Sequence, residues 1–172
     1  VHGDTEPVRM SIDELAEALS CSSAQVIDVR DEDFVGGHIR GSRHLPSAHF
    51  HQGVGYLAQE FADSEQTLVF HCQFSQQRGP ACARLLIYHL TEHFPKHTCG
   101  VRVLDGGFKG WEDRFARSPD VERYIAGRPS VDEAVLANET APGWSGMDAL
   151  PAGRQDLIFA SFQSLLRNCQ VM

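Results

Sequence analysis

The decapeptide HCQFSQQRGP (residues 71–80) decides the interpretation of this chain. It follows the apolar run TLVF, which predicts a short buried strand over 67–70, and it leads into an apolar pattern that predicts a helix over 80–94. Cys72 and Arg78 therefore stand six positions apart at the junction of a strand and a helix.

This junction suits the chemistry of a thiolate beside an anion. A helix N-terminus favours the thiolate form of Cys72, because unpaired amides and the helix dipole attract negative charge. If the backbone between Cys72 and Arg78 curls, its amides form a cup for a tetrahedral oxyanion, which the guanidinium of Arg78 can close with two hydrogen bonds. The predicted oxyanion-binding loop comprises Gln73, Phe74, Ser75, Gln76, Gln77 and Arg78.

Residues around the loop fit this interpretation. Gly79 permits a tight exit from the loop, and Pro80 loses no needed hydrogen bond at the first helical position. We expect Ser75 to donate a hydrogen bond to the sulfur, and His71 to point away from the sulfur and brace the loop by hydrogen bonding. The simpler alternative, that Cys72 is a small buried hydrophobe at a strand end, does not account for the Arg-Gly-Pro sequence that follows.

Strands and helices alternate through the first two thirds of the chain. A Ser-x-x-Glu capping box at Ser11 and Glu14 predicts a helix start. The predicted helices cover 11–20, 49–62, 80–94 and 108–116, and the predicted strands cover 25–29, 43–46, 67–70 and 101–104. This alternation predicts an α/β fold with a parallel sheet flanked by helices on both faces.

The pattern weakens after Ser118 and Pro119. We therefore predict a catalytic domain over 1–125 and a C-terminal extension over 126–172. Within the extension, an apolar helix at about 156–166 is expected to pack back on the domain, with self-association as the alternative.

Composition restricts the partners and the compartment. A formal net charge of −8 disfavours general attraction to nucleic acid or to an anionic membrane. Five cysteines without a CxxC pair suit a reducing compartment, and no apolar run reaches the ~20 residues of a membrane span. We expect a soluble protein of the cytoplasm or the nucleus that binds neither nucleic acid nor membrane.

Three ordered motifs resemble one family. The loop at 71–80, the Asp-x-Arg strand end at 28–30 with the turn GGHIRG at 36–41, and LDGGFKGW at 104–111 are similar to the signatures of the rhodanese-fold cysteine phosphatases of the cell-division-cycle dual-specificity type. That family includes small plant and fungal phosphatases and the eukaryotic arsenate reductases. The resemblance implies a rhodanese-like parallel sheet.

The resemblance leaves two enzymatic activities open. As a tyrosine or dual-specificity phosphatase, the chain would use Cys72 to attack phosphorus, form a phosphocysteine and need no cofactor. As an arsenate reductase, it would attack arsenate with Cys72 and use glutathione and glutaredoxin. The substrate would be a tetrahedral oxyanion, either arsenate or a phosphate ester such as a phosphoprotein.

Two further activities are disfavoured. Sulfurtransferases of the family usually have a loop one residue shorter, so the spacing here argues against thiosulfate sulfur transfer. A non-catalytic phosphate-binding module would need only the amides and Arg78, so the intact Cys72 argues against it.

The chain also departs from the family pattern. Gln73 and Gln77 stand where the cell-cycle phosphatases carry acidic residues, so the loop lacks a carboxylic acid for the leaving group. Val29 stands where those enzymes have a second cysteine; Cys82 is a conceivable substitute, although a structural thiol is favoured.

Asp28 and Arg30, beside the loop, are expected to form a structural ion pair, with substrate contact as the alternative.

His89, His93, His97 and Cys99 are the candidates for a zinc site. Their spacing does not match a strong zinc-binding pattern, so surface histidines are favoured. We therefore expect no metal.

Overall fold

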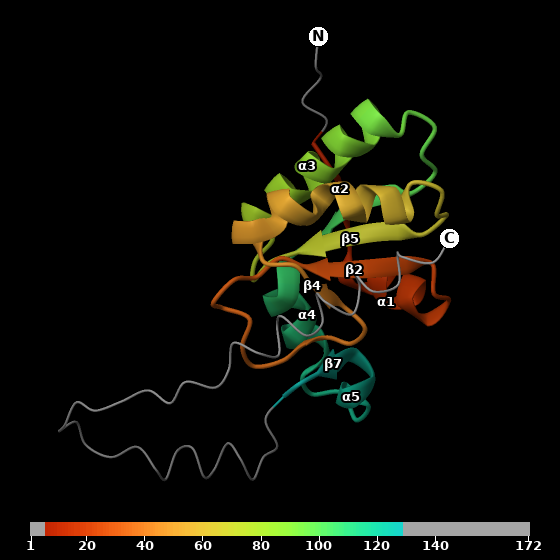
Figure 1. Ribbon diagram of the computed structural model, residues 1–172. Helices are drawn as coiled ribbons and strands as arrows, with labels where there is room; N and C mark the ends of the chain where they lie inside the picture. The colour runs from red at the N-terminus through yellow and green to blue at the C-terminus, as the bar shows by residue number, and fades with distance from the viewer. Residues whose placement is uncertain (1–5, 129–172) are drawn as a thin grey trace, which may run out of the picture. The chain divides into compact units, whose positions relative to one another are not determined.

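The computed structural model describes residues 6–128 and centres on a five-stranded parallel sheet of order β1-β6-β5-β2-β4 (Figure 1). Its strands are β1 (Val8–Met10), β2 (Ala24–Asp28), β4 (Arg43–His44), β5 (Thr67–His71) and β6 (Gly100–Leu104). Its helices are α1 (Ile12–Ser20), α2 (Phe50–Phe61) after the short 3-10 turn η1 (Ser47–His49), α3 (Arg78–His93), α4 (Gly107–Phe115) and α5 (Val121–Tyr124). A separate antiparallel pair joins β3 (His38–Ile39) to β7 (Ile125–Ala126).

Helices cover both faces of the sheet, with α2 and α3 on one side and α1 and α4 on the other (Figure 1). Successive strand residues point to opposite faces, so Phe70 packs with Leu86 of α3 while Val69 packs with Trp111 of α4. All four side chains are fully buried. The α/β class and the parallel sheet predicted from the sequence are confirmed.

Every predicted helix and strand among the described residues is present, with shifts of one or two residues at its ends. The capping box is formed: the Ser11 hydroxyl accepts a hydrogen bond from the Glu14 amide at 3.3 Å, and the Ser11 amide donates to the Glu14 carboxylate at 2.7 Å. The helix after the loop begins at Arg78 rather than Pro80. Pro80 still lies in the first turn, where its missing N–H costs no helical hydrogen bond.

The predicted domain boundary at 125 falls inside β7, since Ile125 and Ala126 pair with β3. Because the described residues end at 128, the division of the chain into two parts stays a prediction. The predicted helix at 156–166 lies outside the described residues.

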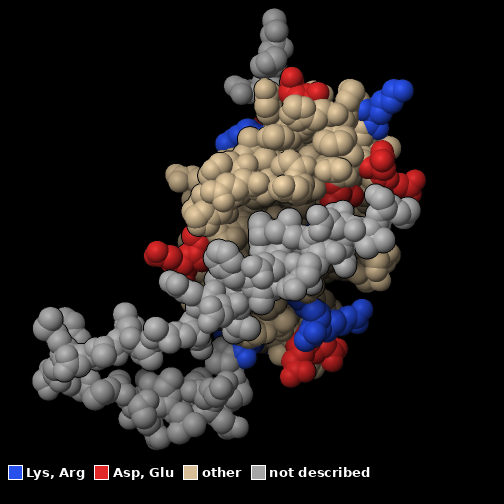
Figure 2. Space-filling view, in the orientation of Figure 1, with Lys and Arg blue, Asp and Glu red and all other residues tan. Residues whose placement is uncertain are grey.

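Charged side chains are dispersed on the visible face. In Figure 2 the described Lys and Arg side chains, and the Asp and Glu side chains, are scattered in small groups over that face. Among residues 6–128, no helix is both long and apolar enough to cross a membrane.

Candidate active site

The carboxyl ends of β2 and β5 place the predicted site residues side by side. The two strands pair in parallel register with Asp28 opposite His71. The segment that follows β2 therefore runs beside the Cys72 loop, at the edge where parallel sheets bind their ligands.

The loop after Cys72 turns three of its carbonyl groups outward. Cys72 O accepts a hydrogen bond from the Phe108 amide at 3.0 Å, and Gln73 O accepts one from the Lys109 amide at 2.9 Å. Ser75 O accepts one from the Arg9 guanidinium at 2.9 Å. In a trans peptide the N–H points opposite to the C=O, so the amides that follow these three carbonyls point away from those donors.

The amide groups of residues 73–77 make no hydrogen bond to any acceptor within residues 6–128. Unpaired amides that follow one another around a loop attract an anion. This arrangement is the backbone geometry that the sequence predicts for the oxyanion-binding loop.

The first turn of α4 touches the loop directly. A Cβ on Gly107 would lie 2.6 Å from both Cys72 O and Gln73 O, and Gly107 has a φ of 61°. Only glycine meets both requirements without strain. This contact was not predicted; the Gly-Gly pair one residue after the predicted strand at 101–104 was its signal in the sequence.

Ser75 and Gly79 differ from the expectation. The left-handed residue of the loop is Ser75, with a φ of 52°, whereas Gly79 lies in α3 with ordinary helical backbone. A Cβ on Gly79 would make only ordinary 3.5 Å contacts with Cys72, His71 and Ser75. The Ser75 hydroxyl is buried and has no described partner, so the predicted bond to the Cys72 sulfur is not formed.

Cys72 itself is nearly enclosed, with 4% of its surface exposed. Phe74, two residues later, is 56% exposed and presents an aromatic ring at the surface of the loop. The loop thus combines a shielded sulfur with an exposed apolar side chain.

Arg78 binds two carboxylates that the sequence analysis did not connect with it. Its Nη1 atom donates to Asp33 at 2.6 Å and to Asp31 at 3.1 Å, and its Nη2 atom donates to Asp33 at 2.5 Å. The hydrogen bonds that Arg78 donates to Asp33 raise the pKa of Arg78 most, those that it donates to Asp31 raise it further, and the charge of Cys72 contributes in the same direction. In return, the Arg78 guanidinium lowers the pKa of Asp33 to about 2.

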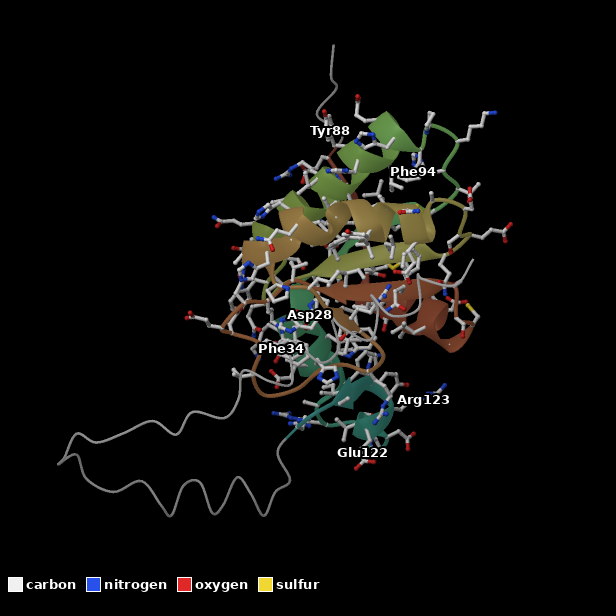
Figure 3. All side chains as sticks on the ribbon, viewed as in Figure 1. Asp28, Phe34, Tyr88, Phe94, Glu122 and Arg123 are labelled. Atoms are coloured by element: carbon white, nitrogen blue, oxygen red, sulfur yellow. The ribbon has the colours of Figure 1, made fainter. Side chains whose placement is uncertain are left out.

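Asp28 and Arg30 form the predicted ion pair, with both side chains fully buried. Arg30 donates to Asp28 through Nε at 3.0 Å and through Nη2 at 2.7 Å, and Nη2 also reaches Gly37 O at 2.9 Å. The guanidinium lies 4.0 Å from the Phe108 ring centroid and 4.9 Å from that of Phe34, which stands close to Asp28 in Figure 3. These contacts support the structural role.

His71 contacts both the ion pair and the loop. Its Nδ1 atom lies 3.2 Å from Cys72 O, and its Nε2 atom lies 3.5 Å from the Asp28 carboxylate. Burial lowers the pKa of His71 more than nearby Asp28 raises it, so the ring is neutral near pH 7. These positions agree with a bracing role.

The remaining cysteine and histidine candidates show no metal arrangement. Burial raises the pKa of Cys82 to about 12, which keeps this helix residue a thiol. The rings of His89 and His93 lie with their centroids 5.4 Å apart and are tilted against each other, but residues 6–128 hold no cluster of three or more His, Cys, Asp or Glu placed for a metal.

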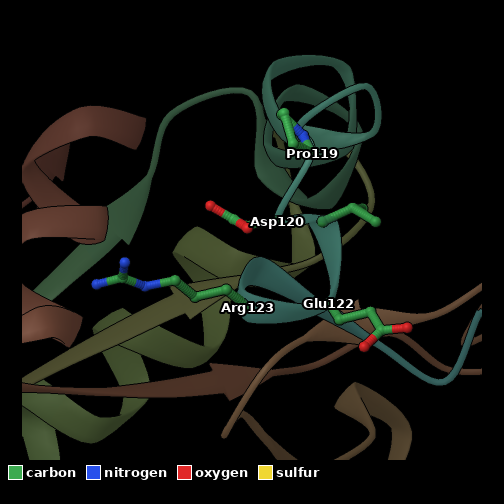
Figure 4. A pocket seen from close by; sticks show the side chains of 5 residues that line it. Pro119, Asp120, Glu122 and Arg123 are labelled. Carbon is green, nitrogen blue, oxygen red and sulfur yellow. The ribbon is translucent and has the colours of Figure 1, made fainter.

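A surface hollow lies elsewhere in the described chain. It has a volume of about 470 Å³ and is lined by residues 119–123, including Asp120, Glu122 and Arg123 (Figure 4). None of these residues belongs to the Cys72 loop, and no thiol lines the hollow.

Comparisons with known proteins agree with this fold. The family described as Rhodanese-like domain matches residues 11–114. A dual-specificity phosphatase of Arabidopsis thaliana is 46% identical over 91 residues, which cover 51% of this chain and 60% of that protein. An arsenate reductase of Oryza sativa subsp. japonica is 42% identical over 89 residues, which cover 51% of this chain and 68% of that protein.

A solved structure shows the same fold. It is described as a yeast protein tyrosine phosphatase of the rhodanese family, and it matches with a TM-score of 0.62 and 28% identity over 72% of this chain and 94% of its own.

Proposed function

The chain belongs to the rhodanese-like domain family, and we propose that it is a cysteine-dependent phosphatase of the tyrosine or dual-specificity type. One observation carries this proposal: carbonyls of the Cys72 loop bind the first turn of α4 and Arg9, which leaves the amides of 73–77 free for an anion. The match covers less than two thirds of the Arabidopsis phosphatase, so the activity is proposed for this chain on its own residues as well as on that similarity.

The chemistry follows from the positions of the loop groups. The Cys72 thiolate attacks phosphorus while the loop amides and Arg78 hold the oxygens of the phosphoryl group. A phosphocysteine forms, the alcohol leaves, and water then releases phosphate. Because these groups stabilise charge that develops during transfer, the reaction needs no cofactor.

The substrate is a phosphate ester, including that of a phosphoprotein. Phe74 supports an aromatic ester, because its exposed ring can pack against the ring of a phosphotyrosine or an aryl phosphate. From the cysteine content we place the protein in the cytoplasm or the nucleus, which localisation of a tagged chain in cells would test.

Arsenate reduction is the second candidate. The arsenate reductase of rice supports it, and so do Gln73 and Gln77, because this reaction requires no protonated alkoxide. In this case Cys72 attacks arsenate, and glutathione with glutaredoxin reduces the adduct to arsenite.

Parallel assays separate the candidates. The purified protein is assayed for p-nitrophenyl phosphate hydrolysis, for glutathione- and glutaredoxin-linked arsenate reduction and for thiosulfate sulfur transfer, each with Cys72→Ser as the control. We expect hydrolysis that Cys72→Ser abolishes, with a phosphocysteine trapped by rapid acid quench. Hydrolysis that survives in Cys72→Ser would refute the role of this loop. Binding of phosphate without turnover in any assay would support the non-catalytic module instead.

A further inference from the structure

Asp33 holds Arg78 with both of its carboxylate oxygens. One oxygen also accepts a hydrogen bond from the Asp31 amide at 3.0 Å. The Arg78 side chain is about one third exposed and that of Asp33 is 37% exposed, so the pair stands at the surface of the loop rather than in the core. An exposed ion pair is weak, and a multiply charged anion can compete with it.

The position of this pair places a carboxylate next to the nucleophile. Asp33 belongs to the segment after β2, and Cys72 follows β5, the neighbouring strand. The Cys72 charge acts on the same guanidinium that Asp33 binds. Arg78 is therefore the side chain that links the Asp33 carboxylate to the surroundings of the reacting sulfur.

We propose that Asp33 is the acid that protonates the leaving oxygen, a role that the loop residues Gln73 and Gln77 cannot fill. This inference rests on the proposed phosphatase function. As the substrate phosphoryl group binds, Arg78 exchanges the Asp33 carboxylate for phosphoryl oxygens, and Asp33 takes up one proton from the solvent. That proton returns to the solvent when phosphate leaves and Arg78 binds Asp33 again.

The proton and electron pairs balance over one cycle. The sulfur–phosphorus bond forms as the ester phosphorus–oxygen bond breaks, and the leaving oxygen keeps that electron pair and receives the Asp33 proton. In the second step water attacks the phosphocysteine and gives its proton to the Asp33 carboxylate. The sulfur–phosphorus electron pair then returns to Cys72 as a thiolate, so Asp33 is protonated again and phosphate is released.

The charges around Asp33 explain how its protonation is switched. Arg78 from α3 is the cation that keeps Asp33 ionised, and the anions nearby are Asp31 on the same segment and Cys72 directly after β5. Moving Arg78 onto the substrate removes the favourable partner and brings a further anion close to Asp33. Both changes raise the pKa of this carboxyl.

Asp31 is less suited to this role because other groups hold it. Its carboxylate accepts hydrogen bonds from the Ser47 hydroxyl at 2.6 Å and from the Ala48 amide at 3.0 Å. These bonds would persist when Arg78 moves, so Asp31 remains an ionised anchor for η1.

The first test compares leaving groups. We expect Asp33→Asn to lower kcat/KM for phenyl phosphate by about tenfold or more beyond its effect on p-nitrophenyl phosphate, since general acid catalysis is worth about 10²–10⁴-fold when the leaving group is poor. The exposed neighbour Glu32 provides the control, and Glu32→Gln should follow the wild type for both esters. An equal loss for both esters would overturn the proposal, and so would a gain for both, which would make Asp33 only a competitor for Arg78.

The second test does not depend on turnover. In Cys72→Ser protein, binding of sulfate, which stays a dianion near neutral pH, is measured by calorimetry in buffers of different ionisation enthalpy. We expect proton uptake that disappears in Asp33→Asn/Cys72→Ser. If Cys72→Ser takes up a proton on binding sulfate but the wild type hydrolyses no ester, the phosphatase function alone is overturned. If the wild type hydrolyses esters, but no proton is taken up and Asp33→Asn shows no larger loss for phenyl phosphate, the role of Asp33 alone is overturned.

Discussion

Gly107 approaches Cys72 so closely that a Cβ at Gly107 would stand 2.6 Å from the Cys72 carbonyl oxygen. The contact lets the amides of Phe108 and Lys109 bind the carbonyls of the loop, which sets the direction of the loop amides. The shape of the anion site therefore depends on a helix that carries none of the proposed reacting groups.

Gly107→Ala should disturb both the fold and the site. The Cβ would collide with two loop carbonyls, and the φ of 61° adds a further cost of about 1–2 kcal/mol. The matched control is Gly41→Ala, because Gly41 has a φ of 79° but nothing within 4 Å of its Cβ. We expect Gly107→Ala to lose more stability in urea denaturation than Gly41→Ala, and to lose ester hydrolysis. Equal losses in the two variants would show that the close approach does not matter.

The Asp28–Arg30 pair should be costly to break. Asp28→Asn leaves the Arg30 charge fully buried without its anion, and Arg30 Nη1 already lacks a described partner. Loss of one partner of a buried pair typically costs about 3–5 kcal/mol. For comparison, Glu60→Gln breaks the exposed pair with Arg43 and should cost about 1 kcal/mol or less. The free energies of unfolding in urea check both values, and similar costs would contradict the structural role.

The sequence carried enough information for the fold. The alternation of apolar strands and amphipathic helices identified the parallel sheet, and the Cys72 to Arg78 spacing predicted the loop whose amides the structure leaves unpaired. The sequence did not predict β1, because a strand of three residues, two of them exposed, carries no periodic apolar pattern. The sequence did not predict the β3–β7 pair, because the two strands lie more than 80 residues apart and local patterns do not specify such pairing.

The partners of Arg78 were missed for a related reason. Asp31 and Asp33 directly follow the Asp-x-Arg motif, yet their approach to Arg78 depends on β2 and β5 being neighbours in the sheet. Strand order is set by the packing of the whole domain. A local pattern therefore showed the residue types but not which of them would meet.

Burial of His71 should make stability depend on pH. Burial lowers its folded pKa below the ordinary value near 6.5, so below about pH 6.5 the unfolded chain binds more protons than the folded one. We expect the free energy of unfolding to fall as the pH drops from about 6.5 toward the lowered folded value.

The variant His71→Gln should reduce this slope. Some slope should remain, because burial also lowers the pKa of His38. The exposed His51 supplies the control, and His51→Gln should keep the wild-type slope. Urea denaturation between about pH 5.5 and 7.5 measures the effect, and an unchanged slope in His71→Gln would rule out His71 as its source.

The cysteines should differ in reactivity according to burial. Cys21 is exposed, whereas burial raises the pKa of Cys82 to about 12 and also raises that of Cys99. Because the thiolate is the reactive form, iodoacetamide at about pH 8 should label Cys21 in the native protein and spare Cys82 and Cys99. Peptide mass spectrometry locates the label, and labelling in urea should reach Cys21, Cys82 and Cys99.

The role of Cys82 as a structural thiol has its own test. We expect no disulfide between Cys72 and Cys82 after mild peroxide treatment, and such a disulfide would show that Cys82 is a protective partner of Cys72.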